Sequence, residues 1–143
     1  MAADLAARSA LSDAFVELRG PLGAGKTAFV RHLLRALGVE GRIKSPSYAL
    51  MEIYSLPRFE AWHFDFYRFD DAQEWEDAGF RDIFASRGLK LVEWPEKAEG
   101  LLPPADLRIT LSPQGDTGRI VAVDALTPRG VELLPAPRTV GVR

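Results

Sequence analysis

The sequence predicts an α/β fold with a mixed central β-sheet flanked by helices, and three observations support this prediction. A short apolar run from Phe15 to Leu18 is typical of a strand and ends directly before a glycine-rich stretch. After that stretch, apolar residues recur at helical spacing up to Leu37, where Gly38 provides a stop. The stretch itself, residues 20–27, reads GPLGAGKT and satisfies the pattern G-x-x-x-x-G-K-[ST] of a phosphate-binding loop. A strand, this loop and a helix in that order predict the P-loop NTPase fold.

The residue types in this loop suit the binding of phosphate groups. Gly20, Gly23 and Gly25 let the backbone curl closely, so that several amide N–H groups point inward. The following helix adds about half a positive charge at its N-terminus. Lys26 can reach the β- and γ-phosphates, and the hydroxyl of Thr27 can fill one oxygen position around Mg²⁺. The loop residues that we expect to bind ATP are Gly20, Leu22, Gly23, Ala24, Gly25, Lys26, Thr27 and Ala28.

The composition is that of an ordinary globular protein, and we expect residues 1–143 to form a single domain. Hydrophobic residues make up 47% of the chain, and no apolar run approaches the roughly 20 residues that a membrane helix needs. The N-terminus carries Asp4 and Asp13 instead of a basic segment followed by an apolar one, which argues against a secretory signal. Cysteine is absent, so disulfides and thiolate metal sites are excluded. We therefore expect a cytoplasmic protein without membrane association.

The charge balance argues against a general attraction to nucleic acid. The formal net charge is −2, so we expect any contact with RNA to be local or indirect. One local concentration of basic residues lies around the end of the first long helix and consists of Arg31, His32, Arg35, Arg42 and Lys44. Cations near a helix C-terminus complement the helix dipole, and we favour this explanation over an RNA-binding role.

Turn signals divide the middle of the chain into further elements. Residues 2–11 form an alanine-rich segment typical of a short helix. A loop begins at Ser45, and residues 48–54 and 59–66 then read as two strands. The turn between them, residues 55–57, is so short that the two strands are expected to pair antiparallel.

The second half of the chain is expected to contain one interrupted helix and several strands. Residues 74–86 read as a helical segment that is broken near Gly79, and residues 89–94 read as a strand. Pro95 is suited to open another short helix. The last third is expected to be sheet and turn, with paired strands at 107–111 and 120–125, a turn at 113–118 and a loose tail at 135–137.

Two acidic residues are candidates for metal binding or for ordering water beside the loop. Asp65 lies at the end of an aromatic strand, and Glu93 follows the apolar run from Leu89 to Val92. A phosphate-binding loop needs an acidic group at a nearby strand end, both to complete the shell of Mg²⁺ and to order water. An acidic residue that ends a strand is often only a solvated terminus, but the presence of the loop favours a functional role for both. The spacing does not say which of the two does which task.

Other aromatic and basic side chains are harder to interpret. His63 could act as a base, but we interpret it as a packed, hydrogen-bonded residue and leave it out of the catalytic set. Tyr48 and Trp94 are better placed to line a nucleotide pocket or touch a partner. Arg119 is a candidate base or phosphate contact, and its alternative interpretation is an exposed arginine in a turn. The aromatic residues expected to lie mostly in the core are Trp62, Phe64, Phe66 and Tyr67.

Four motifs in series resemble the TsaE (YjeE) family, the small bacterial ATPases of tRNA threonylcarbamoyladenosine modification. They are the loop at 20–27, the segment KSPSY at 44–48, the segment HFDFYR at 63–68 and the segment EWPE at 93–96. The resemblance covers the chain from about Phe15 to about Pro104, and the series is far more specific than the loop alone. It implies a P-loop ATPase that binds the TsaB–TsaD pair and uses ATP hydrolysis to support turnover of that complex. In that picture TsaD performs the transfer to adenosine, and this chain meets tRNA only indirectly.

The resemblance also implies roles for individual residues. Thr27 and Glu93 would hold Mg²⁺, Lys26 would neutralise phosphate charge, and Asp65 would be the acidic residue required for hydrolysis. Trp94 would lie beside the nucleotide, and the segment 45–48 would be a mobile switch. The implied cofactors are therefore ATP and Mg²⁺, with Asp65 and Lys26 as the catalytic residues.

The chain departs from the family pattern at three places. Family members usually carry Asp at the position of Pro21 and often Thr at the position of Ala28, and neither change removes a donor that the phosphates need. The sequence also begins later than is usual, which predicts a less enclosed nucleotide base. A misassigned start codon is one hypothesis for this difference, and the intact mass of the native protein tests it.

Two other functions fit the loop, and one class is excluded. A small-molecule kinase would use the same loop and metal geometry, but the chain is short for an acceptor pocket and a lid. A nucleotide-gated adaptor would bind ATP and dock on a partner without useful turnover. The chain contains no asparagine, so it cannot carry the Asn-Lys-x-Asp motif with which GTPases read their base. We see no dedicated arginine finger and therefore expect slow hydrolysis by the protein alone.

Overall fold

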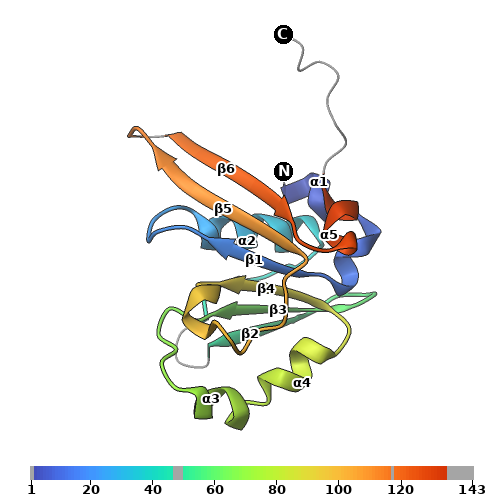
Figure 1. Cartoon of the computed structure of the whole chain (residues 1–143). Coiled ribbons are helices and arrows are strands. Elements are labelled where there is room, and N and C mark those ends of the chain that lie inside the picture. The colour runs from blue at the N-terminus through green and yellow to red at the C-terminus, as the bar shows by residue number, and fades with distance from the viewer. Residues whose placement is uncertain (1, 47–49, 117, 135–143) are drawn as a thin grey trace.

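Six strands form one mixed sheet in the computed structural model, which describes residues 2–46, 50–116 and 118–134 (Figure 1). The strands are β1 (Phe15–Arg19), β2 (Met51–Ser55), β3 (Glu60–Asp65), β4 (Leu89–Glu93), β5 (Leu107–Gln114) and β6 (Gly118–Ala125). Their order across the sheet is β2-β3-β4-β1-β5-β6. The four inner strands run parallel, whereas β2 and β6 at the edges run antiparallel to their neighbours. The mixed sheet and the antiparallel pairing of β2 with β3 are therefore confirmed.

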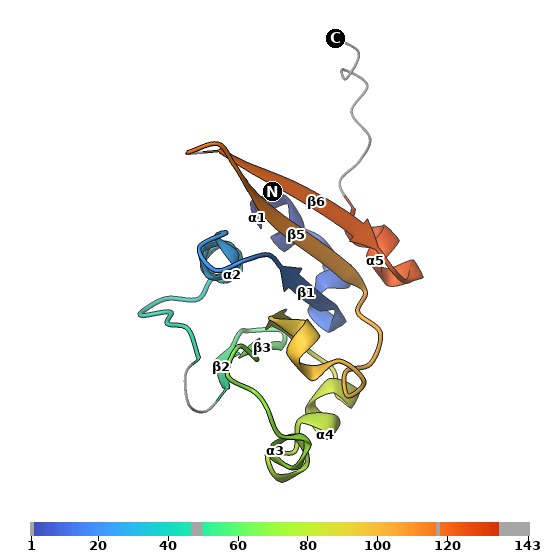
Figure 2. The same cartoon turned by 60° about the vertical axis from the view of Figure 1, so that its left-hand side comes forward.

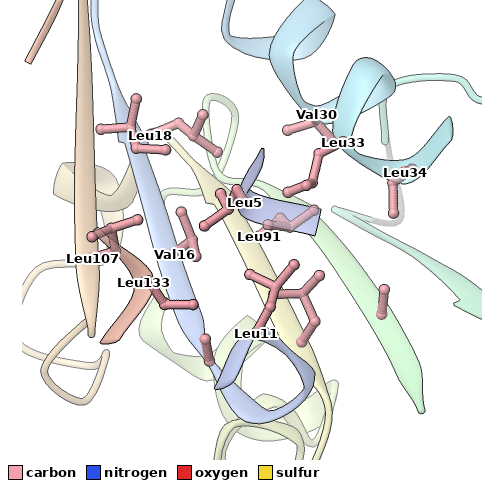
Figure 3. Packing of buried hydrophobic residues seen from close by; sticks show 14 of the residues in the cluster. Leu5, Leu11, Val16, Leu18, Val30, Leu33, Leu34, Leu91, Leu107 and Leu133 are labelled. Atoms are coloured by element: carbon pink, nitrogen blue, oxygen red, sulfur yellow. The ribbon is translucent and has the colours of Figure 1, made fainter. Parts of the chain in front are cut away.

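Helices cover both faces of this sheet (Figures 1 and 2). The α-helices are α1 (Ala2–Ala6), α2 (Lys26–Ala36), α3 (Ala72–Asp77), α4 (Phe80–Ala85) and α5 (Pro128–Leu133), and two short 3-10 helices are η1 (Ser9–Asp13) and η2 (Pro95–Ala98). On one face, leucines from α1, η1, α2 and α5 pack on β1, β4 and β5; we call this aliphatic cluster the α2-side core (Figure 3). On the other face, rings from β3, α3 and α4 form an aromatic core.

The alternation of side chains along β3 directs its polar residues toward α2. Ala61 belongs to the α2-side core, whereas Trp62 and Phe64 belong to the aromatic core. Because successive side chains of a strand point to opposite faces, His63 and Asp65 share the α2 face with Ala61. The same alternation in β4 directs the side chain of its last residue toward α2. The sheet thus presents the carboxylates of Asp65 and Glu93 on the face that α2 covers.

The N-terminal helix is shorter than expected. The sequence predicts one helix over residues 2–11, but α1 ends at Ala6 and η1 begins at Ser9. Between them Arg8 is extended, with φ −85° and ψ 127°. In one continuous helix Leu5 and Leu11 would point roughly 120° apart, yet both are buried in the α2-side core. The break lets both leucines enter the same core.

The C-terminal third contains a helix that the sequence analysis missed. The expected paired strands are confirmed as β5 and β6, but each extends further into the expected turn, to Gln114 and from Gly118. Helix α5 follows β6 where only sheet and turn were expected. Its signal was readable, because Thr127 caps the helix by accepting a hydrogen bond from the N–H of Gly130, and Pro128 occupies the first turn. The expected tail at 135–137 lies outside the described residues.

The remaining elements match the expectations with small shifts. The helical segment expected at 74–86 is α3 and α4, which are separated at Gly79 as predicted. Strand β2 begins at Met51, because Leu50 has a left-handed φ of 63°, and the expected start at 48 lies outside the described residues. No helix of the described residues is long and apolar enough to cross a membrane.

Candidate functional site

The glycine-rich loop lies where the carboxyl ends of three parallel strands meet. β1 leads into the loop, β4 pairs with β1 on one side, and β3 pairs with β4 beyond it. The pairing register places Leu18 beside Glu93, and Glu93 beside Asp65. The two acidic residues singled out from the sequence are therefore neighbours at one edge of the sheet, next to the loop.

The backbone of the loop needs its glycines for two different reasons. Gly20 has φ +146°, and a Cβ atom there would overlap the carbonyl oxygen of Leu111 on β5, so the base of the loop lies closely against the backbone of that neighbouring strand. Gly25 is the N-cap of α2 with a left-handed φ of +100°, a conformation that other residues rarely adopt. At Gly23, by contrast, nothing lies within 4 Å of an added Cβ. The outer side of the loop is therefore open to a ligand.

Lys26 is buried beside the loop and held by two contacts. Its ammonium donates a hydrogen bond to the carbonyl of Gly20 and lies 3.6 Å above the centre of the Trp94 ring. Burial lowers the pKa of Lys26 below its ordinary value, although the nearby carboxylates of Glu93, Glu96 and Asp65 oppose this shift. The ammonium of Lys26, held beside carboxylates and the face of an aromatic ring, is positioned to bind an anionic ligand.

Thr27, Glu93 and His63 form a chain of hydrogen bonds across the edge of the sheet. The Thr27 hydroxyl donates to the Glu93 carboxylate, with distances of 2.9 Å to Oε1 and 3.1 Å to Oε2. The Nε2 atom of His63 lies 2.7 Å from Oε2 of the same carboxylate. Glu93 is 2% exposed and His63 is 1% exposed. Sequence reasoning missed this role of His63, although its place two residues before Asp65 on one strand predicts that both face the same way.

Asp65 lies at the mouth of the site and is only partly buried. One carboxylate oxygen, Oδ1, accepts a hydrogen bond of 3.0 Å from the backbone N–H of Tyr67. Burial raises the pKa of Asp65, the N–H of Tyr67 opposes this effect, and the nearby charge of Glu93 adds to it. A carboxylate with a raised pKa is better able to accept a proton near neutral pH.

Trp94 and Tyr67 form an aromatic wall beside the loop. Trp94 has a left-handed φ of 58°, and its ring centre is 5.0 Å from that of Tyr67. The expectation that Tyr67 lies in the core is wrong, since its exposed fraction is 41%. The reason is that β3 ends at Asp65, so Tyr67 is no longer part of the sheet and lies against Trp94 at the cleft.

Arg119 reaches the loop from the hairpin between β5 and β6. An added Cβ on Gly25 would lie 3.1 Å from Nε of Arg119, so this side chain rests against the beginning of α2. Residue 119 is exposed, which agrees with its position in a hairpin. The hairpin therefore brings the side chain of the candidate arginine to the loop. In Figure 1 the tip of β5 and β6 lies on the same side of the molecule as the loop between β1 and α2.

A cleft of about 310 Å³ joins these parts of the site. Its lining is Leu22, Gly23, Ala24, Gly25, Lys26, Thr27, Ala28, Asp65, Tyr67, Glu93 and Trp94. Gly20 lies beneath it as the acceptor for Lys26. Within the described ranges, no group of three or more His, Asp or Glu could hold a metal ion by itself. The hydroxyl of Thr27 and the carboxylate of Glu93 are nevertheless adjacent oxygen donors of the kind that Mg²⁺ prefers, and a phosphate and water would supply the other ligands.

Two other candidates from the sequence are not part of this cleft: the expected switch segment and the basic cluster at the end of α2. Residues 47 and 48 of the expected switch are not among the described residues, and Pro46 is buried. In the basic cluster, Arg35 donates a hydrogen bond of 3.1 Å to the carbonyl of Val39, just after α2. This contact agrees with the interpretation of the cluster as a complement to the C-terminus of the helix.

The class of protein follows from the sheet and the loop together. A mixed sheet with parallel inner strands, in which β1 leads through a GPLGAGKT loop into α2, is the P-loop NTPase fold. The model of the family described as "Threonylcarbamoyl adenosine biosynthesis protein TsaE" matches residues 1–121 of the chain. This protein belongs to the TsaE family.

Individual relatives and one solved structure agree with this assignment. The chain is 40% identical over 121 residues to the tRNA threonylcarbamoyladenosine biosynthesis protein TsaE of Haemophilus influenzae, covering 85% of this chain and 76% of that protein. It is 35% identical over 109 residues to the protein of the same name from Bacillus subtilis, covering 76% and 68%. The crystal structure of Bacillus subtilis YdiB superposes with a TM-score of 0.71 at 28% identity, over 92% of this chain and 81% of the other.

Proposed function

We propose that this protein binds ATP with Mg²⁺ in the cleft and hydrolyses it in tRNA threonylcarbamoyladenosine biosynthesis. Membership of the TsaE family supports the role in this biosynthesis. One observation carries the ATPase proposal: Lys26 and Thr27 of the loop meet Glu93 and Asp65 in a single cleft. These are the side chains that phosphate binding and hydrolysis require, and they come from three separate parts of the sequence.

In this proposal each residue has a defined task. The N–H groups of the loop and the ammonium of Lys26 bind the β- and γ-phosphates. Thr27 and Glu93 would hold Mg²⁺, which neutralises charge on the phosphates. Trp94 and Arg119 would border the bound nucleotide, and Ala28 and Leu22 complete the lining.

Asp65 is assigned the proton transfer. Its Oδ1 is engaged by the N–H of Tyr67, so Oδ2 is the oxygen left to accept a proton from an attacking water. The water oxygen bonds to the γ-phosphorus, the bond from that phosphorus to the β,γ-bridging oxygen breaks, and ADP and phosphate leave. The raised pKa of Asp65 favours acceptance of this proton.

We also propose that hydrolysis is slow until a partner is bound. In the described part of the chain, no arginine is among the residues that line the cleft, and Arg119 rests against the loop backbone. A P-loop enzyme without an arginine at the phosphates can lose several orders of magnitude in rate. The TsaB–TsaD pair is the proposed partner, and the cytoplasm is the proposed compartment.

The test measures binding and turnover separately. Isothermal titration of Mg–ATP into the folded protein is expected to give saturable heat, and phosphate release is expected to rise when the TsaB–TsaD pair is added. Asp65→Asn is expected to keep binding and lower turnover by about 100-fold or more, while Glu93→Gln is expected to weaken the Mg²⁺-dependent binding. Asp70→Asn changes an exposed carboxylate nearby and serves as the matched control.

Three results would contradict the proposal in different ways. Absence of heat from Mg–ATP would remove the nucleotide site altogether. Saturable binding without phosphate release under any condition would leave a nucleotide-gated adaptor as the function. Normal phosphate release by both the Asp65 and Glu93 variants would overturn only the roles assigned to these two residues.

A further inference from the structure

His63 is a buried polar residue for which packing alone gives no explanation. It lies near the end of β3, on the face that β3 shares with α2, and it is 1% exposed. Ala61 and Asp65 lie two residues before and after it on the same strand, and across the sheet it pairs with Leu91 on β4 and Glu52 on β2. An aliphatic residue in such surroundings would need no hydrogen-bond partner.

The two ring nitrogens of His63 differ in their surroundings. Nε2 lies 2.7 Å from Oε2 of Glu93. Nδ1 is buried and has no hydrogen-bond partner among the described residues. A carboxylate oxygen accepts and does not donate, so the proton of this bond is on Nε2. Among the described residues, the Glu93 carboxylate is therefore the one hydrogen-bond partner of this buried ring.

The contact fixes the direction of the Glu93 side chain. A glutamate has several rotatable bonds, and loss of their freedom is unfavourable unless partners hold the carboxylate. In the described residues those partners are Thr27 on the loop and His63 on the sheet. Thr27 lines the cleft that a ligand would enter, whereas the imidazole is buried on β3, between β2 and β4. His63 is therefore the partner that does not depend on the ligand.

We propose that His63 is a positioning residue for a divalent cation at Glu93. Its Nε2–H holds Oε2 of Glu93 so that the carboxylate stays beside the Thr27 hydroxyl. This inference rests on the proposed function, because it takes Thr27 and Glu93 as the oxygen donors to Mg²⁺. Groups that orient a metal ligand without touching the metal typically change metal affinity or activity by about 10- to 100-fold when they are replaced.

Three substitutions at this position separate the donor from the bulk of the ring. His63→Gln places an amide N–H near the position of Nε2, His63→Asn places one near the position of Nδ1, and His63→Leu fills the space without a donor. Binding of ATP is titrated calorimetrically at a series of Mg²⁺ concentrations and in EDTA. Circular dichroism and thermal melting show which variants are folded.

The proposal predicts a pattern across the variants and not a single loss. His63→Leu and His63→Asn are expected to need at least about tenfold more Mg²⁺ for half-maximal binding, while His63→Gln stays near the wild type and all three bind ATP alike in EDTA. In the Glu93→Gln background, His63→Leu is expected to add no further loss, because its effect passes through Glu93.

The possible contrary results are distinct. If folded His63→Leu and His63→Asn show the Mg²⁺ dependence of the wild type, the inference is overturned while the proposed function stands. Equal losses in the Gln and Asn variants, or a full additional loss in the Glu93→Gln background, would assign His63 a packing role and overturn it as well. Absence of Mg–ATP binding by the wild type would overturn the proposed function and this inference with it. If His63→Leu does not fold, the comparison of Gln with Asn decides the question.

Discussion

The two ends of the parallel strands both gather buried charged groups, but the partners of these groups differ. At the carboxyl ends, Glu93 is held by the side chains of Thr27 and His63. At the amino ends, Asp106 accepts one hydrogen bond of 2.8 Å from the backbone N–H of Phe15 and another of 2.6 Å from the hydroxyl of Thr127. One carboxylate joins Thr27 of the cleft to the buried ring of His63, and the other joins the backbone of β1 to the cap of α5.

This difference distinguishes the candidate binding site, at the carboxyl ends of the strands, from structural contacts at their amino ends. The cleft at the carboxyl ends is open, and Lys26 there can exchange the Gly20 carbonyl for a ligand oxygen. At the amino ends, Gly130 packs so closely that a Cβ atom would overlap the carbonyl oxygen of Asp106. We therefore expect substitutions at the carboxyl ends to change binding and those at the amino ends to change the free energy of unfolding.

The largest expected effect is on binding. Lys26→Ala removes the ammonium that faces the cleft, and we expect Mg–ATP affinity to fall by at least about 100-fold, or about 3 kcal/mol. Fluorescence or calorimetric titration measures the loss. Lys97→Ala, which removes an exposed lysine on η2, is the control and should bind normally. Near-normal affinity of Lys26→Ala for Mg–ATP would contradict the expectation that the carboxyl ends of the strands serve ligand binding.

The matching change at the other end concerns stability. Asp106→Ala leaves the N–H of Phe15 and the hydroxyl of Thr127 without their acceptor, and we expect the free energy of unfolding to fall by about 3 kcal/mol. Urea denaturation measures this change. The folded variant should bind Mg–ATP like the wild type. A loss of affinity without a loss of stability would contradict the comparison.

Two glycine substitutions sharpen the contrast with one added methyl group each. Gly130→Ala is expected to destabilise the fold by about 2 kcal/mol, because the backbone at Asp106 must move, and to leave binding unchanged. Gly23→Ala has free space around it but φ +80°, so we expect a smaller loss of about 1 kcal/mol together with weaker Mg–ATP binding. The same urea and calorimetric measurements test both. Equal binding by the two variants would show that the outer side of the loop is not a ligand surface.

The smallest expected effect is a pH dependence at Lys90. This residue is buried near the amino ends, and burial lowers the pKa of its ammonium below the ordinary value of 10.5. Between the folded and the unfolded pKa the unfolded chain binds more protons, so the stability contributed by Lys90 rises with pH through that window. Below the folded pKa the full penalty for burying the charge is present.

Comparison with Lys90→Met isolates this contribution. The free energy of unfolding of the wild type, relative to that of the variant, is expected to increase as the pH rises toward 10.5. Urea denaturation of both proteins at several alkaline pH values measures it. Taking the difference cancels groups that titrate in both chains. A constant or falling difference would mean that Lys90 is not destabilised by burial.

Local patterns in the sequence were sufficient to predict the loop and its two acidic partners. Asp65 and Glu93 could be identified because each ends an apolar run, and the pairing of β3 with β4 places them side by side. Gly79 interrupted the helix as expected, because a glycine between two helical segments is a strong local signal. These predictions depend on neighbours in sequence.

The contacts that were missed depend on residues far apart in sequence. The bond from His63 to Glu93 joins two residues that lie 30 positions apart on different strands, so neither segment by itself indicates its partner. The single helix expected at 2–11 failed because two leucines had to enter one core, which periodicity within the segment does not reveal. Helix α5 was overlooked despite a readable cap at Thr127.

The central place of β1 also affects how the chain can reach its fold. This strand is made first, but its partners are β4 and β5, and Phe15 pairs with Lys90 while Val16 pairs with Leu107. Such distant pairings are slow to form. During synthesis, the apolar residues of β1 must wait until most of the polypeptide has emerged from the ribosome. The nascent first half therefore exposes apolar surface until β4 and β5 have been made, and we expect the loop to acquire its shape only with them.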